Sequence, residues 1–571
     1  MNESRVSTAT DYLKIVLSRW FVPLREHMVL KMMSQNSVPI HTFAVHQSDG
    51  NNRFIVIFRS ETQLDQLAIT CHPDKCKYSI GSSNPVYFNT LADIITNIIT
   101  KKIRIKVESD RELKMRCTSK NPIPVGKWFI ANKMGSRALE YFKNGDSSTF
   151  AMWLTEEGDY ELGVNYDAVK TFKIYPVKNG YTLDNITIHK NIEDLVAYYT
   201  KNPINIPGSE RCKALPRPFD CSAFYACMIN RRMEVLLQKT PDKNGTRNVE
   251  LFYLEFADLD TKSKAFSYLF TDATQPQNVM KNRYPNILAY NHSRVKLENK
   301  ENDYINANFV MTEFQPYSAA YILCQAPKNE TVQDMWFMII QEKVKIIVVL
   351  TKLIEKGVVK CVKYWPDLGE SMHLWDTYTV TTKDENQKAD IIYSTLEIVN
   401  NNDKTSWELV IVHYLGWPDH FVPEEPWGTL ELLGYFNHHR EKNPNSTAVI
   451  HCSAGVGRSG AFVVLDILFQ KIKQEGVSAV IDIKETVLAV RKQRAHSNNL
   501  YFVKYKSENL SIFINKCLND NYGQELTNRL WKLVSQRFYL FIKYFDNSAS
   551  NSALRKGFPK SLSSESNPID L

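Results

Sequence analysis

The sequence predicts two small α+β modules followed by one large α/β domain. Two segments within the first 210 residues repeat one plan: a helical pattern, several alternating strands and a second helical pattern. From about residue 220 onward, long helical patterns alternate with strongly apolar strands, which is typical of a single large α/β domain. One of these strands leads into a glycine-rich turn, CSAGVGR at 452–458, on which most of the functional argument depends.

The first module is predicted over residues 18–115. It opens with RWF (Arg19–Phe21), continues through HTFAVH (His41–His46) and the apolar strand FIVIF (Phe54–Phe58), and closes on the helical pattern TLADIITNII (Thr90–Ile99). This order of elements makes a compact module of about 100 residues.

The second module is predicted over residues 126–210. It opens with KWF (Lys127–Phe129), and its expected elements follow in chain order: helix ALEYF (138–142), strands STFAMW (148–153), DYELGV (159–164) and TFKIYP (171–176), and the closing helical segment IEDLVAYYTKNP (192–203). A proline-spaced stretch, NPINIPGSERCKALPRPF, then separates the modules from the remainder of the chain.

The large domain is predicted over residues 221–518. Its clearest buried strands are KIIVVLTKL (Lys345–Leu353), WELVIVHYL (Trp407–Leu415) and AVIHC (Ala448–Cys452). Beyond it, residues 525–545 are apolar at helical spacing, and we expect this helix to pack on its own domain rather than on a membrane surface. The serine-rich segment 547–571 is expected to be disordered.

Composition excludes several classes of protein. The net charge of +8 over 571 residues comes without a lysine–arginine block, so nucleic acid is not an expected partner. The N-terminus lacks the basic-then-apolar order of a secretory signal, and no run approaches the ~18 apolar residues that a membrane span needs. The ten cysteines are scattered, which favours a reduced, cytoplasmic protein without a zinc site.

The turn at 452–458 has two interpretations, a catalytic cysteine in a phosphate cradle or a buried thiol in a tight strand-to-helix turn. The residues between Cys452 and Arg458 are small enough for successive backbone N–H groups to converge on an anion at the start of a helix. Such a site also stabilises a thiolate, lowering its pKa from about 8.5 to about 3.5–7.5. Arg458 offers a planar fork that matches two phosphate oxygens. The sequence favours the nucleophile.

The longer string HCSAGVGRSG, with His451 before the cysteine and Ser459 after the arginine, resembles the active-site signature of cysteine-dependent protein tyrosine phosphatases. Four more strings resemble that family's motifs in the family's order: KNRYPNILAYNHSRVKL (281–297), DYINANFV (303–310), CQAPKNETVQDMW (324–336) and GWPDHFVP (416–423). The resemblance implies an α/β phosphatase fold over most of 270–495.

The resemblance also implies roles for individual residues. Cys452 attacks phosphorus, Arg458 binds the phosphate, Asp419 protonates the leaving tyrosine and later activates water, and Ser459 eases release of the thiolate. The implied substrate-binding residues are Tyr284, Asn286, Ser453, Ala454, Gly455, Val456 and Gly457, and the implied supporting residues are His451, Glu355 and Lys360. No metal or other cofactor is expected, because the cradle supplies the positive charge.

Two departures from the family lie in the large domain. In QRAHSNNLYF, His496 stands at the usual glycine, Tyr501 arrives about three residues early, and both glutamines that position water in the family are missing. Asn498 or Asn499 is a candidate substitute; alternatively, the loop is merely shorter and water still has a path. Phe421 stands where the family has a glycine, which would slow closure of the acid loop unless its side chain points to solvent.

The two front modules resemble a tandem pair of SH2 domains, which makes the chain similar to non-receptor phosphatases of the Shp/Corkscrew group. An SH2 domain binds phosphotyrosine through an arginine in F-L-V-R, but here the matching strings FAVH and FAMW place His46 and Trp153 at that position. The usual assisting histidine appears as Leu67 and Phe172. The modules are therefore predicted to be degenerate, and binding of phosphotyrosine by the usual route is not expected.

These observations predict a cytoplasmic enzyme that hydrolyses phosphotyrosine in signalling proteins through a cysteinyl-phosphate. The alternative is a pseudo-phosphatase that binds or traps phosphotyrosine, with impaired hydrolysis of the intermediate, and a third option is a scaffold. Phosphotyrosine-containing proteins are the expected partners. In the group resembled, the first SH2 domain plugs the phosphatase site, and Asp74 lies roughly where such an intramolecular contact would fall.

Overall fold

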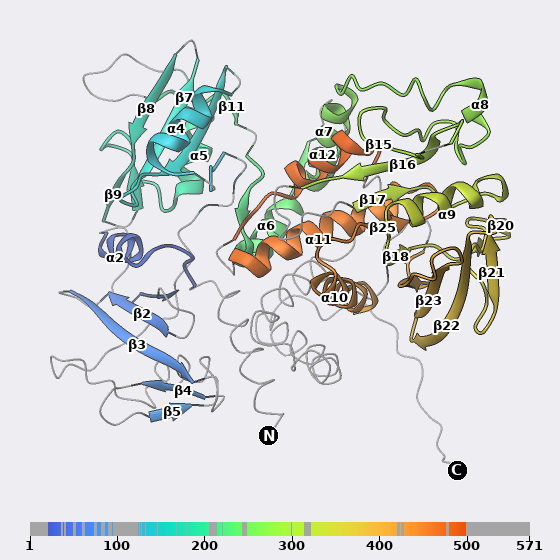
Figure 1. The fold of residues 1–571 in the computed structure, drawn as a ribbon. Coiled ribbons are helices and arrows are strands. Elements are labelled where there is room, and N and C mark those ends of the chain that lie inside the picture. Colours follow the sequence, from blue (N-terminus) through green and yellow to red (C-terminus); the bar gives the residue numbers. More distant parts are fainter. Residues whose placement is uncertain are drawn as a thin grey trace, which may run out of the picture.

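The computed structural model (Figure 1) describes most of the chain between Phe21 and Ser497. The described residues are 21–35, 38, 42–48, 53–59, 63–72, 77–80, 86–88, 94, 124, 126, 128–131, 133–145, 147–166, 168–178, 180–204, 214–219, 221–241, 248–298, 300–312, 321–418, 423, 427–475 and 479–497. The predicted helix at 525–545 and tail at 547–571 lie outside them.

The first module contains a five-stranded antiparallel sheet whose strands are neighbours in chain order. The strands are β1 (Phe43–Gln47), β2 (Arg53–Arg59), β3 (Leu64–His72), β4 (Lys77–Ile80) and β5 (Val86–Phe88). Helix α2 (Glu26–Ser34) buries four side chains, two of which are Met28 and Met32, in the core with the apolar residues of β2. Of the predicted helix at Thr90–Ile99, the structure describes only Ile94.

The second module also has a central sheet, in the order β11-β6-β7-β8, with a small hairpin and two helices. Its elements are α4 (Gly135–Lys143), β6 (Thr149–Leu154), β7 (Tyr160–Asn165), β8 (Val169–Lys173), β9 (Tyr175–Val177), β10 (Gly180–Thr182), α5 (Ile192–Tyr199) and β11 (Arg217–Pro218). Helix α5 begins where the Asn191 side chain accepts a hydrogen bond from the Asp194 amide. The predicted strands and helices of this module are confirmed to within a few residues.

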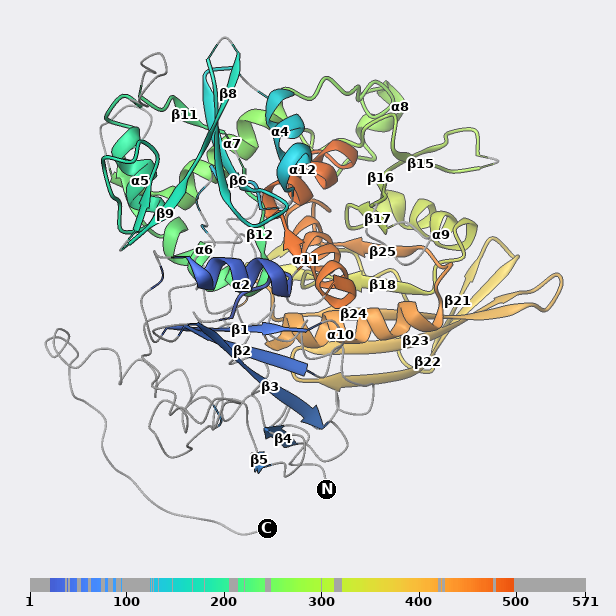
Figure 2. The ribbon, with the colours of Figure 1, turned by 90° about the vertical axis from the view of Figure 1, so that its left-hand side faces the viewer.

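The two modules contact each other through α2. Both views place α2 between the sheet of the first module and the second module (Figure 2). The Asp159 carboxylate lies 2.9 Å from the Lys31 ammonium of α2 and 3.1 Å from that of Lys173 in β8. This shared carboxylate joins an element of each module.

The large domain is built on a nine-stranded mixed sheet in the order β15-β16-β17-β25-β18-β24-β23-β22-β21. These strands are β15 (Arg294–Lys296), β16 (Tyr304–Val310), β17 (Tyr321–Cys324), β18 (Ile346–Val349), β21 (Ser371–Leu374), β22 (Tyr378–Lys388), β23 (Ile391–Asn400), β24 (Ser406–Tyr414) and β25 (Ala448–His451). Its small pairs are β12 (Phe224–Tyr225) with β26 (Val480–Ile481), β13 (Lys239–Pro241) with β14 (Asn248–Glu250), and β19 (Ile354–Glu355) with β20 (Val358–Val359). Its helices are α6 (Ile229–Leu236), α7 (Leu251–Lys264), α8 (Pro276–Val279), α9 (Val332–Gln341), α10 (Trp427–Lys442), α11 (Gly457–Glu475) and α12 (Ile483–Gln493), with short 3-10 turns at Ala226–Met228 and Asn329–Thr331.

Helices cover both faces of the central strands, which explains why those strands read as continuous apolar runs. In β18, Ile346 and Val348 belong to the core shared with α10 and α11, whereas Ile347 and Val349 belong to the core shared with α9. The three strongest predicted strands are confirmed as β18, β24 and β25, which lie together in the parallel centre of the sheet. Cys452 directly follows β25, which lies between β17 and β18.

The segment between the second module and the large domain is bound to both. Its strand β11 pairs in parallel with β6, and Phe219 donates its amide to the Phe150 carbonyl. Cys221 and Ala223 share a buried cluster with Trp153, against which Val480 of the large domain also packs. One residue along, the Ser222 hydroxyl donates to the Asp482 carboxylate at 2.7 Å. Among the helices of the described residues, none is long and apolar enough to cross a membrane.

Candidate active site

Cys452 lies in the loop between β25 and α11. Strand β25 is fully buried and ends at His451, and α11 begins at Gly457, so residues 452–456 turn at the start of a helix. Within this loop Gly455 has a φ of +70°, and a Cβ at this position would lie 1.9 Å from the Cys324 carbonyl oxygen. Only glycine fits here, because both the backbone conformation and the available space exclude a side chain. We call residues Cys452–Arg458 the cradle.

The cradle favours the ionised form of Cys452. Burial, which leaves Cys452 5% exposed, raises the pKa of the thiol, but the Arg458 charge and hydrogen bonds from Ser459 and the Gly455 amide outweigh it. The net pKa of Cys452 therefore lies below its ordinary value. Ser459 is fully buried, and its hydroxyl has no oxygen or nitrogen partner among the described residues, which leaves it available to the sulfur.

Arg458 is held in one orientation by Glu355. Its Nη1 donates to Oε1 of Glu355 at 2.7 Å and its Nη2 to Oε2 at 2.9 Å, while Nη1 also donates to the Leu350 carbonyl. Such a bidentate pair fixes the plane of the guanidinium as well as its position. Glu355 comes from the β19–β20 hairpin, about 100 residues earlier in the chain, so the tertiary fold creates this pair.

His451 lies beneath Cys452 in a neutral form. Burial lowers the pKa of His451 to about 4 and raises the pKa of Tyr364 well above its ordinary value. The Tyr364 hydroxyl therefore donates to Nε2 at 2.9 Å, and Nδ1 donates to the Cys452 carbonyl at 3.1 Å. These two contacts define the orientation of the imidazole and hold the backbone of the nucleophile.

Tyr284 and Lys360 both reach the cradle at Ser453. The Ser453 hydroxyl donates to the Lys360 carbonyl at 3.2 Å, so the Tyr284 hydroxyl, 2.9 Å away, donates to the Ser453 oxygen. Tyr284 and Lys360 are half-buried, and Asn286 is exposed on the same loop as Tyr284. Ala454 and Gly457 are half-buried, whereas Val456 is buried in the turn.

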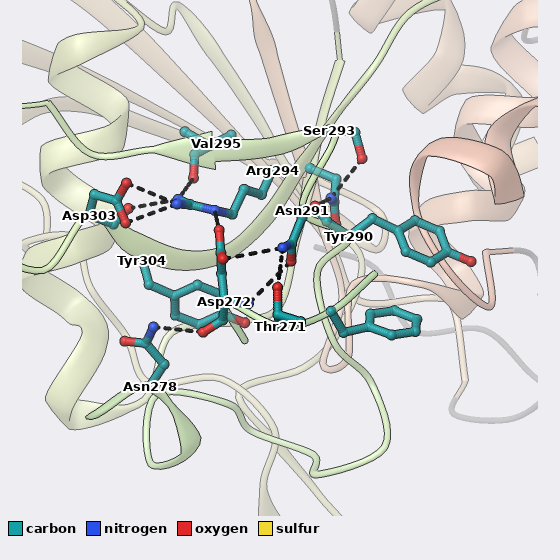
Figure 3. A network of polar contacts seen from close by, with 12 residues as sticks. Thr271, Asp272, Asn278, Tyr290, Asn291, Ser293, Arg294, Val295, Asp303 and Tyr304 are labelled. Atoms are coloured by element: carbon teal, nitrogen blue, oxygen red, sulfur yellow. Dashed lines mark hydrogen bonds and ion pairs between the residues drawn. The ribbon is translucent and has the colours of Figure 1, made fainter. Parts of the chain in front are cut away.

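The loop that carries Tyr284 is anchored at its far end by an ionic network (Figure 3). The Arg294 guanidinium lies between Asp272 and Asp303, with contacts of 2.6 Å to the first and 2.9 and 3.0 Å to the second. Asn291 donates from its amide to the Asp272 carboxylate and accepts from the Asp272 backbone. The end of the loop is thus joined to β15 and to the residue that precedes β16.

Arg494, at the end of α12, connects this loop to the cradle. It is fully buried, and its guanidinium donates to the carbonyls of Ala454 and Gly455 at 3.1 and 3.2 Å. It also donates to the side-chain carbonyls of Asn306 and Asn308 in β16, whose amide groups hold the Tyr284 loop through the carbonyls of residues 287 and 290. Sequence reasoning assigned no role to Arg494, although Gln493 and Arg494 open the string QRAHSNNLYF that was compared with the family.

Comparison with known proteins adds an independent observation. Residues 278–502 match the family model described as protein-tyrosine phosphatase. These residues form a protein-tyrosine phosphatase domain. Human tyrosine-protein phosphatase non-receptor type 2 is 36% identical over 253 residues, which is 42% of this chain and 60% of that protein. Human tyrosine-protein phosphatase non-receptor type 12 is 34% identical over 266 residues, which is 46% of this chain and 33% of that protein. The chain thus matches only part of the length of each relative.

Several predicted positions of the phosphatase domain lie outside the described residues. They are Asp419 and Phe421 of the acid loop, Asn498 and Asn499, and Tyr501.

Trp417, which precedes the acid loop, is buried against Tyr414. His496 has a φ of +58°, so the backbone keeps a left-handed conformation at the position where the family has glycine. Within the described residues no group of His, Cys, Asp and Glu side chains is arranged to hold a metal ion.

The two residues that the sequence comparison matched to the SH2 arginine, His46 and Trp153, are both buried. Trp153 is fully buried beside Phe142, and its indole nitrogen donates to the Glu161 carboxylate at 2.8 Å. His46 is buried in β1, with Nδ1 3.2 Å from the Gln47 carbonyl. Leu67 and Phe172 lie on β3 and β8. Asp74 lies outside the described residues.

Proposed function

We propose that this protein hydrolyses phosphotyrosine in other proteins through a cysteinyl-phosphate intermediate. The observation that carries the proposal is the pairing of a thiol of lowered pKa, Cys452, with Arg458, whose guanidinium is fixed by Glu355 in a glycine-dependent cradle. The match of residues 278–502 to the protein-tyrosine phosphatase family supports it.

In the first step the Cys452 thiolate attacks phosphorus. A sulfur–phosphorus bond forms while the bond from phosphorus to the tyrosine oxygen breaks, and Asp419 donates its proton to that oxygen. Arg458 and the backbone amides of the cradle hold the charge that develops on the phosphoryl oxygens. The protein contributes a preformed anion site, because Glu355 orients Arg458 before substrate arrives.

In the second step water attacks the cysteinyl-phosphate. Asp419, now ionised, accepts a proton from the water, the sulfur–phosphorus bond breaks, and inorganic phosphate leaves. Ser459 donates to the departing sulfur, a role supported by its burial beside Cys452 and by its part in lowering the pKa of that thiol.

Phosphotyrosine is the proposed substrate rather than phosphoserine. Tyr284 stands at the rim of the cradle, 2.9 Å from Ser453, where its ring can lie along the ring of a substrate tyrosine and make the site deep. A phosphoserine is too short to place its phosphate at Cys452 past such a wall. Asn286 is the proposed partner of the substrate backbone, which is supported by its exposure on the same loop.

We propose that the front half consists of two degenerate SH2-like modules, at 18–115 and 126–210, before a catalytic domain at 221–518. A sheet with a helix against it in each described module supports this division. Neither module binds phosphotyrosine by the usual route, since buried Trp153 and His46 replace the required arginine. The second module instead serves as a packing unit on the catalytic domain, which is supported by the buried cluster of Trp153 with Cys221, Ala223 and Val480.

A thiolate nucleophile also requires a reducing environment, so we propose that the enzyme works in the cytoplasm, in intracellular signalling. Four cysteines of the described residues, Cys221, Cys324, Cys361 and Cys452, are free thiols, in keeping with this proposal.

The experiment that tests the proposal is rapid-mixing hydrolysis of p-nitrophenyl phosphate by the full-length protein, with Cys452→Ser as the control. Release of phenol and of phosphate is followed separately. Sustained release of both, unaffected by a metal chelator and absent in the control, is expected. A single burst of phenol without phosphate would identify a phosphotyrosine trap instead, and no release at all would overturn the proposed enzyme.

A further inference from the structure

The β19–β20 hairpin has a rigid two-residue turn. Lys356 and Gly357, the two residues of the turn, have φ values of +50° and +78°, as a type I′ turn requires. Directly opposite residues pair in two rungs, Ile354 with Val359 and Glu355 with Val358. The direction of each side chain on this hairpin therefore follows from the register.

Side chains of directly opposite residues lie on the same face of a hairpin. Glu355 reaches the Arg458 guanidinium, so its face is the one turned toward the cradle. Its partner Val358 shares that face, and it is 57% exposed. Ile354 and Val359 point to the opposite face and are 60% and 53% exposed.

The hairpin is attached to both the cradle and the loop that carries Tyr284. The Lys360 carbonyl accepts from the Ser453 hydroxyl at 3.2 Å, and the Val359 carbonyl accepts from Nη1 of Arg283 at 3.2 Å. Tyr284, the next residue after Arg283, also contacts Ser453. The hairpin and the loop that carries Tyr284 therefore both border the cradle at Ser453.

We propose that Val358 is a specificity-determining residue that contacts an apolar side chain next to the phosphotyrosine of the substrate. This inference rests on the proposed function and names the class of peptide that the site prefers. Neighbouring residues of an extended peptide are about 3.3 Å apart along the chain, so a residue beside the phosphotyrosine comes within reach of the mouth of the cradle. Burying the exposed methyl groups of Val358 against an aliphatic side chain favours such peptides over peptides with a polar residue there.

The test uses the full-length protein and two phosphotyrosyl peptides that differ only in having leucine or serine at the positions flanking the phosphotyrosine. Val358→Thr keeps the β-branched shape of the side chain and changes only its polarity. Val359→Thr is the matched control, because Val359 has similar exposure on the opposite face. The parent protein is expected to hydrolyse the leucine peptide with a kcat/KM about three to ten times higher than that of the serine peptide.

Val358→Thr is expected to lower that preference about threefold while leaving hydrolysis of p-nitrophenyl phosphate unchanged, and Val359→Thr is expected to keep the preference. An unchanged preference in Val358→Thr, or an equal loss in Val359→Thr, would overturn the inference. A parent protein that fails to hydrolyse p-nitrophenyl phosphate would count against the proposed function alone. In that case the ratio of peptide affinities, measured with each substitution in Cys452→Ser protein, still decides whether Val358 selects apolar peptides.

Discussion

Arg494 donates a hydrogen bond from Nη2 to the carbonyl of Ala454, at 3.1 Å. The amide of the same peptide unit belongs to Gly455 and hydrogen-bonds to the Cys452 thiol. Because a peptide unit is planar, with its C=O and N–H pointing in opposite directions, a cation that holds the oxygen also aims the N–H at the sulfur. Arg494 is thus placed to position the cradle without contacting the reacting atoms.

Arg494→Lys is expected to lower kcat/KM about tenfold to a hundredfold, because a lysine cannot hold both cradle carbonyls and both asparagines at once. The pH at which kcat/KM rises should move upward, since a less well aligned amide stabilises the thiolate less. Arg491→Lys is the matched control: this buried arginine of α12 bonds Asp260 and Ser263 and does not bond the cradle carbonyls. An equal change of the pH profile in both variants would mean that the effect is one of general stability.

Glu355→Gln is expected to weaken substrate binding and turnover together. It keeps the shape of the side chain but removes the charge that holds both Nη atoms of Arg458, a loss of about 1.5–3 kcal/mol. This corresponds to a fall in kcat/KM of roughly ten- to a hundredfold. Steady-state kinetics with p-nitrophenyl phosphate measures it, and a fall below threefold would contradict a bidentate role. Lys356→Gln, at the exposed tip of the same hairpin, is the control.

The lowered pKa of Cys452 predicts selective alkylation. Burial raises the pKa of Cys221, Cys324 and Cys361 to about 12, whereas the Arg458 charge brings the pKa of Cys452 below its ordinary value despite burial. Iodoacetamide at neutral pH should therefore modify Cys452 before these three thiols, as peptide mass spectrometry would reveal. Faster labelling of Cys324 or Cys361 would contradict the assignment.

The lowered pKa of Cys452 also determines how the stability of the protein depends on pH. A thiol whose pKa is lower in the folded state stabilises the fold fully above its ordinary pKa, and this contribution is lost as the pH falls through the folded value. Cys452→Ser should consequently lower the free energy of unfolding more at high pH than at low pH, as urea titrations at several pH values would measure.

The lowered pKa of the buried His451 predicts that the protein is less stable in acid. Its pKa is about 4 in the folded state and near 6.5 when exposed, so between these values the unfolded chain binds a proton that the folded chain does not. Stability should therefore fall as the pH drops from 6.5 to 4, by roughly 3 kcal/mol from this group. His451→Gln should reduce this dependence in urea titrations, and the exposed His373→Gln should leave it unchanged.

His496→Gly is expected to stabilise the protein by about 1 kcal/mol, because it removes a side chain from a left-handed backbone position with a φ of +58°. Thermal unfolding followed by circular dichroism measures the effect. Lys492→Gly, on an exposed position within α12, should have the opposite effect, since glycine weakens a helix interior. A destabilised His496→Gly would mean that the imidazole makes contacts worth more than the strain.

The central strands and the turn at Cys452 were predictable because their signals are local. Apolar runs of strand length, the small residues that follow Cys452 and the helix that starts beside them all follow from neighbouring residues, whereas the lack of room for a Cβ at Gly455 is caused by the distant Cys324 carbonyl. Glu355 was named as a supporting residue only through family resemblance, since no local pattern joins it to Arg458, about 100 positions away. The role of Arg494 and the support of His451 by Tyr364 were not predicted, because a buried polar group shows its partner only after the chain has folded.

The sequence by itself determined the order of the elements, the chemistry available at 452–459 and the presence of His46 and Trp153 at the ends of the strings FAVH and FAMW. These depend on residue type and on periodicity along the chain. The tertiary structure alone decided which distant groups meet: Glu355 and Tyr284 at the cradle, Arg494 behind it, and Cys221 with Trp153 between the second module and the phosphatase domain. The physical reason is that a buried charge or hydrogen bond is stable only with a partner, and the sheet topology determines which residue that partner is.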